Sequence, residues 1–500
     1  MSFGLRSRTS AGVIILRWVS IGCIFLAVAV TGFELVSYSR IRSIFPAGMI
    51  IGGLPVGGLT QQQAADRLVQ SYSVPVEIHY GDAVIQVKPA VLGFELDSES
   101  MMAAADLERI NQPFWSAFWD YLWLRSPSPQ EIPLRYTITE DRLRSYLNTD
   151  IVPRYDQPPL AGLPLAGSTN FQTGQAGTVL DVDRAVILIE DALTSPTARV
   201  VNLSYNQVSP PRPSFQNLQI LLEQIINLAQ VSDEAELYML DLQTNQELHF
   251  ALQGGNIVPP DITFTAASTI KIPIMVSVFR RIPDPIPQGI ADLLSGMIEA
   301  SENEPADKLM SDVINKDNGP LEVTKDMQSL GFKNTFLAGY FAPGSPLLRK
   351  ITTPGNSRTD IQTSPDPYNQ TSPADMGMLL DDIYQCADVG GGALVAVFPG
   401  EYTQSKCKQM ITYLIGNHLP MLITAGLPEG TQIAHKHGWI TESDGLLHTI
   451  GDAAIVYTPG GNFILSIYLH NKTQLLFDPA NTLIADLARA VYNYFNQGTQ

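Results

Sequence analysis

The sequence contains little cysteine and comparatively little positive charge. Its 500 residues include three cysteines, and 31 Lys and Arg stand against 49 Asp and Glu, which gives a net charge of −18. This excess of negative charge argues against nucleic acid or anionic lipid headgroups as the main partner, because both repel an acidic protein. The cysteines argue against a thiol mechanism, since neither Cys386 nor Cys407 lies in a histidine-bearing setting.

The pairing of these two cysteines stays open at the level of sequence. They lie 21 residues apart and outside the N-terminal apolar segment that contains Cys23. An oxidising compartment permits a disulfide between them, and two unpaired buried thiols are the alternative.

The composition predicts folded domains rather than a disordered chain. Apolar residues make up 45% of the sequence and charged residues 16%, values that fit globular proteins. A chain of this length predicts two or three domains.

The N-terminus predicts a membrane anchor over residues 1–40. Arg6, Arg8 and Arg17 precede an uncharged run, residues 18–33. With the apolar residues before Arg17, this run is long enough to span a bilayer, and its basic flank places the N-terminus in the cytoplasm and the bulk of the chain outside.

Two other interpretations of this segment remain open. The triplet Ala27-Val28-Ala29 is typical of a cleaved signal peptide, and Ser20-Ile21-Gly22-Cys23 faintly resembles a lipoprotein acylation site. All three interpretations place the bulk of the protein outside the cytoplasm.

Residues 41–205 predict an α+β domain. Thr60 and Gln63 form a capping box before a helix, and the alternating segments 74–80 and 83–87 flank a Gly81-Asp82 turn. A strand end followed by a helix occurs near residue 93 and again near residue 177, which indicates a duplicated small unit.

Three tryptophans share one face of a predicted helix between these copies. Trp115, Trp119 and Trp123 recur every four residues. Such a stripe favours a helix packed on its own domain, and the alternative is contact with a ligand or a membrane surface.

A Pro-rich joint at 206–215 predicts a boundary before a second α+β domain, residues 216–500. Strands are expected at both ends of this domain, with a helical middle at 290–420 and long Pro- and Gly-rich loops. This order predicts an antiparallel sheet whose terminal helices pack on one face.

One lysine stands at the head of an apolar helix in this domain. Ser268 and Lys271 are three residues apart in "FTAASTIKIPIMVSVFRR" and share a helical face. A serine hydroxyl needs a base to become a nucleophile, and a lysine of depressed pKa is such a base. The helix N-terminus would help to stabilise an oxyanion.

The S-x-x-K pattern alone is weak, because Ser405 and Lys408 repeat it. Ser268, however, precedes an apolar helix and is followed in order by Ser301-Glu302-Asn303 and Lys436-His437-Gly438. This ordered set of S-x-x-K, S-x-N and K-x-G is known from class A β-lactamases and penicillin-binding proteins.

Residues 216–500 resemble that serine hydrolase family in "LYMLDLQTNQEL", "FTAASTIKIPI", "SENEPADKLM", "QTSPADMGMLLDDIY", "AHKHGW" and "HTIGDAAIVYTPGGNFIL". The resemblance implies that Ser268 is the acylated nucleophile, that Lys271 is its base and that Ser301 relays a proton to the leaving nitrogen. It also implies that Asn303 holds the substrate's amide side chain and that Lys436, with His437 and Gly438, forms the strand that binds the substrate carboxylate. The backbone N–H groups of Ser268 and Trp439 would bind the oxyanion.

The chain departs from the family pattern at two motif positions. Glu302 stands where the family usually has Asp, and His437 stands where it usually has Thr or Ser. An imidazole can still donate a hydrogen bond to a substrate carboxylate. His435 and His437 lack a nearby cluster of carboxylates or cysteines, so we expect neither a metal nor another cofactor.

The larger departure concerns deacylation. Class A β-lactamases activate the deacylating water with a loop glutamate, and this chain has no glutamate between Glu322 and Glu401. Asp360 and Asp366 are the carboxylates in plausible loop positions, and each is one methylene shorter. We therefore expect efficient acylation and impaired deacylation.

The N-terminal region resembles the peptidoglycan-binding domain found beside VanW-type and L,D-transpeptidase modules, in "IGGLPVGGLTQQQAADRL", "AVLGFELD", "RYDQPPLAGL" and "GQAGTVLDVDRA". The expected partners are thus peptidoglycan, a membrane and a β-lactam or acyl-D-Ala-D-Ala-type substrate. Three functions stay open: a β-lactamase-like hydrolase, a D,D-peptidase, and a non-catalytic wall-binding or β-lactam-sensing protein.

Overall fold

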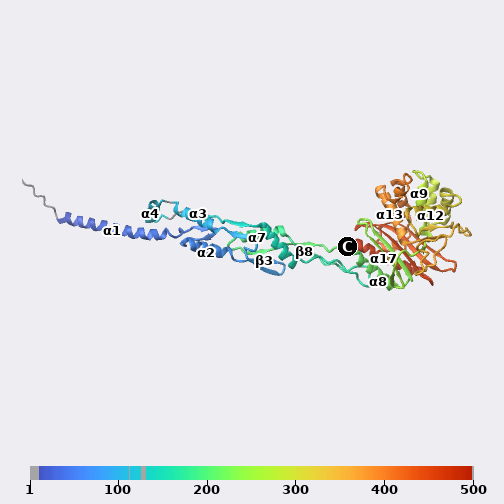
Figure 1. Ribbon diagram of the computed structural model, residues 1–500, viewed down its shortest axis with the longest axis horizontal. Helices are drawn as coiled ribbons and strands as arrows, with labels where there is room; N and C mark the ends of the chain where they lie inside the picture. The colour runs from blue at the N-terminus through green and yellow to red at the C-terminus, as the bar shows by residue number, and fades with distance from the viewer. Residues whose placement is uncertain (1–10, 112, 126–130, 498–500) are drawn as a thin grey trace, which may run out of the picture. The chain divides into compact units, whose positions relative to one another are not determined.

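The computed structural model describes residues 11–111, 113–125 and 131–497, and the chain divides into two compact units (Figure 1). The N-terminal unit comprises residues 1–159 and 176–209, and the C-terminal unit comprises residues 160–175 and 210–500. The division at 209/210 falls inside the Pro-rich joint. Residues 160–175 belong to the C-terminal unit, a placement that the sequence did not indicate.

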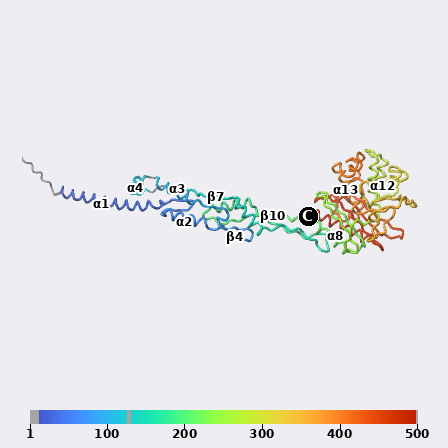
Figure 2. The backbone as a smooth tube through the Cα atoms, in the orientation of Figure 1, coloured from blue at the N-terminus to red at the C-terminus, as the bar shows by residue number. Residues whose placement is uncertain are grey.

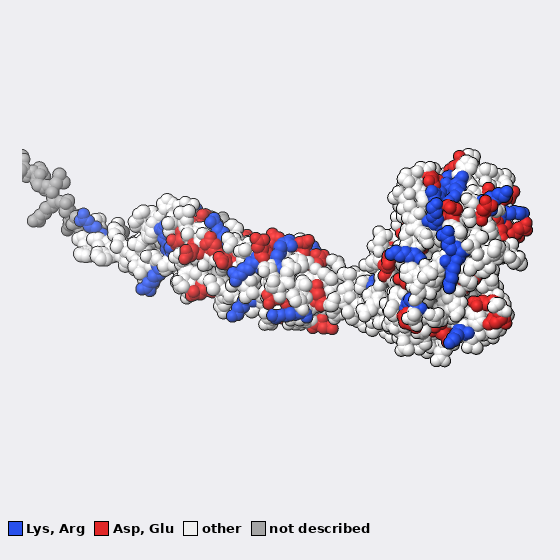
Figure 3. All heavy atoms as spheres, turned by 45° about the vertical axis from the view of Figure 1, so that its right-hand side comes forward, with Lys and Arg blue, Asp and Glu red and all other residues white. Residues whose placement is uncertain are grey.

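The N-terminal unit begins with a long apolar helix, α1 (Ala11–Ile41). Over Gly12–Ile41 this helix is long and apolar enough to cross a membrane, a property that signal sequences share. Figure 3 shows few charged atoms along it.

The rest of this unit is mixed α+β, as the sequence predicted. The Thr60 capping box and the hairpin around Gly81 are both present. Strand β3 pairs antiparallel with β4 and parallel with β9, over a core of its own. The elements after α1 are β1 (Ile50–Ile51), β2 (Leu54–Pro55), α2 (Gln61–Tyr72), β3 (Val76–Tyr80), β4 (Ala83–Val87), β5 (Phe94–Leu96), α3 (Ser98–Ile110), α4 (Phe114–Leu122), β6 (Glu131–Ile132), β7 (Tyr136–Ile138), α5 (Glu140–Tyr146), η1 (Leu147–Ile151), α6 (Val152–Tyr155), β8 (Gly177–Leu180), α7 (Val182–Thr194), β9 (Val200–Asn202) and β10 (Tyr205–Val208).

The tryptophan stripe on α4 differs from expectation. The buried residue of this helix is Phe118, whereas Trp115, Trp119 and Trp123 are all exposed. The helix packs on its own unit through the neighbouring face, so the tryptophans remain uncovered by the described residues.

The C-terminal unit is built on a six-stranded antiparallel sheet of order β13-β12-β11-β19-β18-β17. Helices α8 and α17 cover one face and the helical middle covers the other, each over its own apolar core. Figure 2 shows the last helix returning beside α8. The expected sheet with terminal helices on one face is thus present.

The helical middle lies between β12 and β17 along the chain. Its elements and those of the sheet are α8 (Phe215–Ala229), β11 (Glu234–Asp241), β12 (Glu247–Gln253), β13 (Asn256–Val258), β14 (Phe264–Thr265), η2 (Ala267–Ile270), α9 (Lys271–Arg281), α10 (Gln288–Ile298), α11 (Asn303–Lys308), η3 (Leu309–Ile314), α12 (Gly319–Leu330), β15 (Phe336–Leu337), β16 (Asn369–Thr371), α13 (Pro373–Val389), α14 (Ala393–Val397), α15 (Gln404–Ile415), α16 (Ile423–Gly426), β17 (Gln432–Thr441), β18 (Leu447–Tyr457), β19 (Phe463–His470) and α17 (Phe477–Phe495). Turn η2 lies against the edge strand β17, which brings the three sequence motifs together.

Candidate active site

Ser268 lies on a tight turn that leads directly into a buried helix. The turn η2 runs into α9, and the residue before the serine, Ala267, has φ +48°. Such a backbone conformation is uncommon for a residue with a side chain and is typical of functional turns. Ser268 itself stays partly exposed, whereas its neighbours Ala267 and Thr269 are buried.

Lys271 is fully buried and makes three short hydrogen bonds. Its Nζ lies 3.0 Å from Ser268 Oγ, and it donates to Ser301 O at 2.6 Å and to Asn303 Oδ1 at 2.8 Å. The last two partners are acceptors that cannot donate. A neutral amine gives its two N–H bonds to them and directs its lone pair at Ser268 Oγ.

Burial lowers the pKa of Lys271 to about 8, against the opposing charges of Asp307 and Glu302. Desolvation disfavours the ammonium, so near neutral pH a useful fraction of the amine is neutral. This is the protonation state that a general base for a serine hydroxyl requires.

Ser301 connects the two lysines of the site. Lys436 Nζ, on β17, donates to Ser301 Oγ at 2.9 Å, and Lys271 Nζ lies 3.5 Å from the same oxygen. Ser301 has φ +61°, so its backbone is held in an uncommon conformation that presents the hydroxyl between them. Burial, together with the charge of Lys271, lowers the pKa of Lys436 to about 7, against the opposing charge of Asp452.

Gly438 allows the edge strand to approach the nucleophile turn. A Cβ on this residue would stand 2.7 Å from Ala266 O, 2.8 Å from Thr269 N and 2.9 Å from Ser268 N. These neighbours are backbone atoms, which cannot move aside independently. The glycine of the third motif is therefore required sterically, whatever the substrate.

His437 is buried on the other side of β17 from Lys436. Its Nδ1 lies 3.1 Å from Asn417 Nδ2, and its ring stacks on Trp439 with centroids 4.9 Å apart. Burial lowers its pKa to about 3, helped by the charge of Lys436. The ring is therefore neutral, and with Nδ1 accepting from the Asn417 amide its Nε2 carries the proton.

Phe341 faces Lys271 from the loop after β15. The Lys271 Nζ lies 5.5 Å from the centroid of the Phe341 ring. Asp307 fixes this loop by accepting from the backbone N–H groups of Phe341 and Ala342, each at 2.8 Å. Sequence reasoning missed both residues, because a contact across some 70 positions leaves no periodic signal in a Pro- and Gly-rich loop.

Neither aspartate considered for deacylation bonds to Ser268, Lys271 or Ser301. Asp360 is exposed and ion-paired with Arg358 at 2.8 Å. Asp366 accepts from the Tyr368 backbone N–H and from Asn369 Nδ2, both at 2.9 Å. Each carboxylate is thus held by an ion pair or hydrogen bonds within its own loop.

The second S-x-x-K copy forms no comparable site. Ser405 and Lys408 are exposed on α15, and the hydroxyl of Ser405 accepts from Gln409 within the same helix. Nearby, Cys386 and Cys407 are joined by a disulfide. The structure thus has the disulfide rather than two unpaired buried thiols, the alternatives that the sequence left open.

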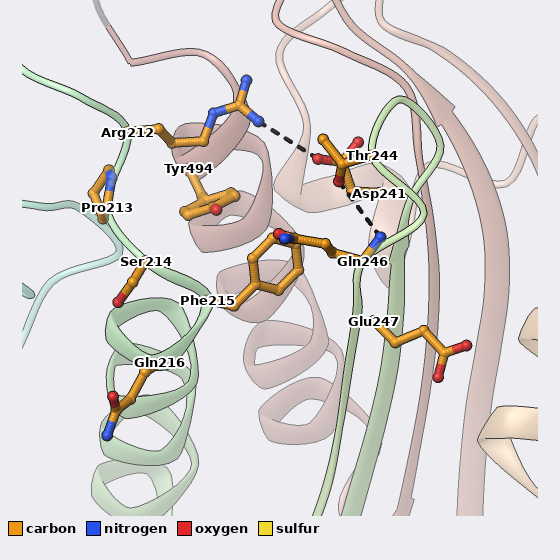
Figure 4. Close-up of a pocket in the computed structure, with 10 residues that line it drawn as sticks. All are labelled: Arg212, Pro213, Ser214, Phe215, Gln216, Asp241, Thr244, Gln246, Glu247 and Tyr494. Carbon is orange, nitrogen blue, oxygen red and sulfur yellow. Dashed lines mark hydrogen bonds and ion pairs between the residues drawn. The ribbon is translucent and has the colours of Figure 1, made fainter.

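Two other features of the C-terminal unit lie apart from these motifs. Glu236, His249 and Asp261 bring three potential metal ligands together, but Glu236 already accepts from His249 and from two backbone N–H groups. An open cavity of about 700 Å³ lies between the start of α8 and the β11–β12 turn, where Arg212 pairs with Asp241 (Figure 4). None of the motif residues lines it.

The C-terminal region is similar to known proteins. Residues 286–495 match the Beta-lactamase enzyme family, a range that includes the second and third motifs and begins after Lys271. None of the curated proteins matches the chain.

Among solved structures, the chain is similar to a mutant of PBP-A in an acyl-enzyme complex with penicillin G, at 22% identity and a TM-score of 0.40, over 58% of this chain and 99% of that one. It is similar to a β-lactamase from Desulfarculus baarsii DSM 2075 at 18% identity and a TM-score of 0.41, over 56% and 98%. It is also similar to the class A β-lactamase of the last common ancestor of Gram-negative bacteria at 22% identity and 0.39, over 54% and 97%. The family match over residues 286–495 supports a serine hydrolase.

Proposed function

We propose that the protein is an extracytoplasmic serine hydrolase that is acylated at Ser268 by β-lactams or acyl-D-Ala-D-Ala-type peptides and releases the acyl group slowly. The observation that carries this proposal is the contact of Lys271 Nζ with Ser268 Oγ, with the two shortest hydrogen bonds of the amine going to oxygens that can only accept.

Acylation uses the three motifs in turn. The neutral amine of Lys271 takes the proton of Ser268 Oγ–H, and Oγ bonds to the substrate's carbonyl carbon. The backbone N–H groups of Ser268 and Trp439 stabilise the oxyanion. As the carbonyl carbon–nitrogen bond breaks, Ser301 Oγ–H gives its proton to the leaving nitrogen and regains one from a neighbouring lysine.

Substrate binding uses the edge strand and the second motif. Lys436 attracts the substrate carboxylate, and His437, on the opposite face of β17, supports the strand through its bond to Asn417 and its stacking on Trp439. Asn303 holds the amide side chain through its side-chain amide group. Gly438 keeps the strand close enough to the serine for these contacts.

Neither Asp360 nor Asp366 is placed to act as a base in deacylation, since each is held within its own loop. An incoming water needs a carboxylate that holds it against the ester carbonyl and removes its proton. The residue that faces Lys271 from the loop is Phe341, whose ring has no acceptor. Loss of general-base help is worth about 10²–10⁴-fold in rate, so the acyl-enzyme persists.

This persistence favours a second candidate, a D,D-peptidase or a β-lactam-binding protein rather than an efficient β-lactamase. A D,D-peptidase that works at the rate of cell-wall turnover needs only slow release of the acyl group to an amine or water. A β-lactam sensor needs no release at all. In all cases the same serine is acylated.

The remaining parts of the chain fit a location at the cell wall. We propose that α1 anchors the chain in the membrane with the bulk outside, as its basic flank and apolar length support. The N-terminal unit is proposed to bind peptidoglycan, on the resemblance of its sequence.

The lifetime of the adduct tests the proposal. The full chain is labelled with a fluorescent penicillin, chased with excess unlabelled drug and sampled over time, while a chromogenic β-lactam reports turnover. We expect a fast stoichiometric burst, slow steady-state hydrolysis and a lasting label. Absence of any adduct would refute the proposed nucleophile, and rapid multiple turnover would identify an efficient β-lactamase instead.

A further inference from the structure

A row of exposed tryptophans lies along α4 in the N-terminal unit. Trp115, Trp119 and Trp123 are 69%, 59% and 65% exposed, and Leu124, which follows the helix, is 90% exposed. Large apolar side chains rarely remain so open in a continuous row unless they mark an interaction surface. Asp120 is the charged residue within the helix, and it pairs with Arg125 at 3.7 Å.

The neighbouring face of α4 packs on the C-terminal end of α1. The ring of Tyr38 contacts Phe114 and Phe118, with centroids 5.5 and 5.4 Å apart. Tyr121 donates its hydroxyl to Glu34 Oε2 at 3.0 Å. These contacts fix the place of α4 along α1, as the ribbon also shows (Figure 1).

That place coincides with the outer end of the apolar span. The hydrocarbon core of a bilayer is about 30 Å thick, which takes about 20 residues at ~1.5 Å each. If α1 spans the membrane from a start between Gly12 and Trp18, the outer edge of the hydrocarbon falls between about residues 31 and 37, at or just below the level of Glu34 to Tyr38. This is the stretch of α1 that α4 covers.

We propose that Trp115, Trp119 and Trp123 insert into the outer interface of the lipid bilayer beside the anchor, as a second membrane contact. The proposal rests on the anchor proposed above. Tryptophan favours the boundary between headgroups and acyl chains, where its ring is apolar and its N–H reaches water. The contacts of α4 run antiparallel along α1, from Phe114 beside Arg42 to Tyr121 beside Glu34, so Trp123 lies at the end of the row nearest the hydrocarbon.

The occupant is a lipid surface of neutral headgroups. The chain carries a net charge of −18, so attraction to anionic lipid does not drive the contact. The insertion of three indole rings depends on apolar area and needs no charge. Phosphatidylcholine vesicles are therefore the appropriate probe.

The test measures the depth of these tryptophans in a bilayer. Five tryptophans occur in the sequence, so a full-length Trp18→Phe, Trp439→Phe variant retains fluorescence from the row alone. It is reconstituted into phosphatidylcholine vesicles with bromine atoms either just below the headgroups or at the chain ends. We expect blue-shifted emission, stronger quenching by the shallow bromines, and protection from aqueous iodide.

A matched pair of variants assigns any signal to the row. In the Trp18→Phe, Trp439→Phe background, replacing Trp115 and Trp119 with serine removes apolar area from the row, so the remaining Trp123 should lose much of its lipid-quenchable emission. The control replaces three exposed apolar residues of the C-terminal unit, Leu228, Ile257 and Val389, with serine and retains it.

The outcomes separate this inference from the proposed function. A chain that fails to float with the vesicles would contradict the anchor itself. A chain that floats while iodide quenches the row fully would overturn the lipid contact and leave the anchor standing. Protection from iodide without quenching by either bromolipid would show that a protein, such as a second copy, covers the row, and would also overturn the inference.

Discussion

Lys271 Nζ lies 3.0 Å from Ser268 Oγ, and its two other close partners are oxygens that can only accept. This arrangement orients a neutral amine as a base toward one hydroxyl. Lys271 can act as a base only because burial lowers the pKa of its amine, since an ammonium has no lone pair to offer.

The first prediction concerns the pH dependence of acylation. Burial lowers the pKa of Lys271 to about 8, so the amine is mainly protonated at pH 6 and mainly neutral at pH 9. The acylation rate constant should rise about tenfold per pH unit below pH 8 and level off above it. Stopped-flow measurement with a chromogenic β-lactam checks this, and a rate that falls between pH 6 and 8 would contradict the role of Lys271.

The second prediction concerns Phe341. Replacing it with Glu places a carboxylate next to Lys271, where a deacylating water can be held. We expect steady-state hydrolysis to accelerate toward the ~10²–10⁴-fold that general-base help provides, while the burst amplitude stays at one per enzyme.

Phe341→Leu is the matched control, because it removes the ring without adding a base. The two variants are compared by burst and steady-state phases on the same substrate. Equal steady-state rates in the two would show that the water is activated from elsewhere, with Asp360→Asn and Asp366→Asn as the next variants to measure.

The third prediction concerns the approach of β17 to the nucleophile turn. Gly438→Ala drives a Cβ against the backbone of Ala266, Ser268 and Thr269. A displacement of the serine by about 1 Å costs on the order of 100-fold in rate, so acylation should slow by about that factor. Gly289→Ala, where the added Cβ meets open space, should leave the rate unchanged; an equal loss in both would point to instability instead.

The sequence predicted those parts of the site that local spacing determines. Ser268 and Lys271 are one turn apart, and the order of the motifs anticipated the meeting of Ser301 with Lys436, which the sheet then provides. The place of Phe341 and the occupied state of Asp360 depend on loop contacts over long separations. Such contacts leave no periodic pattern in the sequence from which they could be predicted.

The same distinction applies to the fold. The capping box at Thr60 and the hairpin at Gly81 are local features and were correct. Residues 160–175 join the C-terminal unit because Phe171 packs on Tyr494 and Asn493 donates to Thr169, contacts that no pattern in the segment announces. The exposed face of α4 was misjudged because the tryptophan stripe alone does not reveal which face Tyr38 covers.

The fourth prediction concerns the disulfide. Cys386 and Cys407 connect α13 with α15, away from the motif residues, and close a loop with a sequence separation of 21. In the chain-entropy account such a loop is worth about 3 kcal/mol. A Cys386→Ser, Cys407→Ser variant should unfold at lower urea concentration and still be acylated at the normal rate. Loss of acylation in a variant that remains folded would revive a thiol mechanism.

The most direct test of the central claim is intact mass spectrometry after incubation with a β-lactam. The wild-type chain and Ser405→Ala should each gain the mass of one drug molecule, and Ser268→Ala should gain none, because Lys271 is positioned to activate Ser268 whereas the Ser405 hydroxyl accepts from Gln409. An adduct that persists in Ser268→Ala would show that another residue is the nucleophile and would contradict the account.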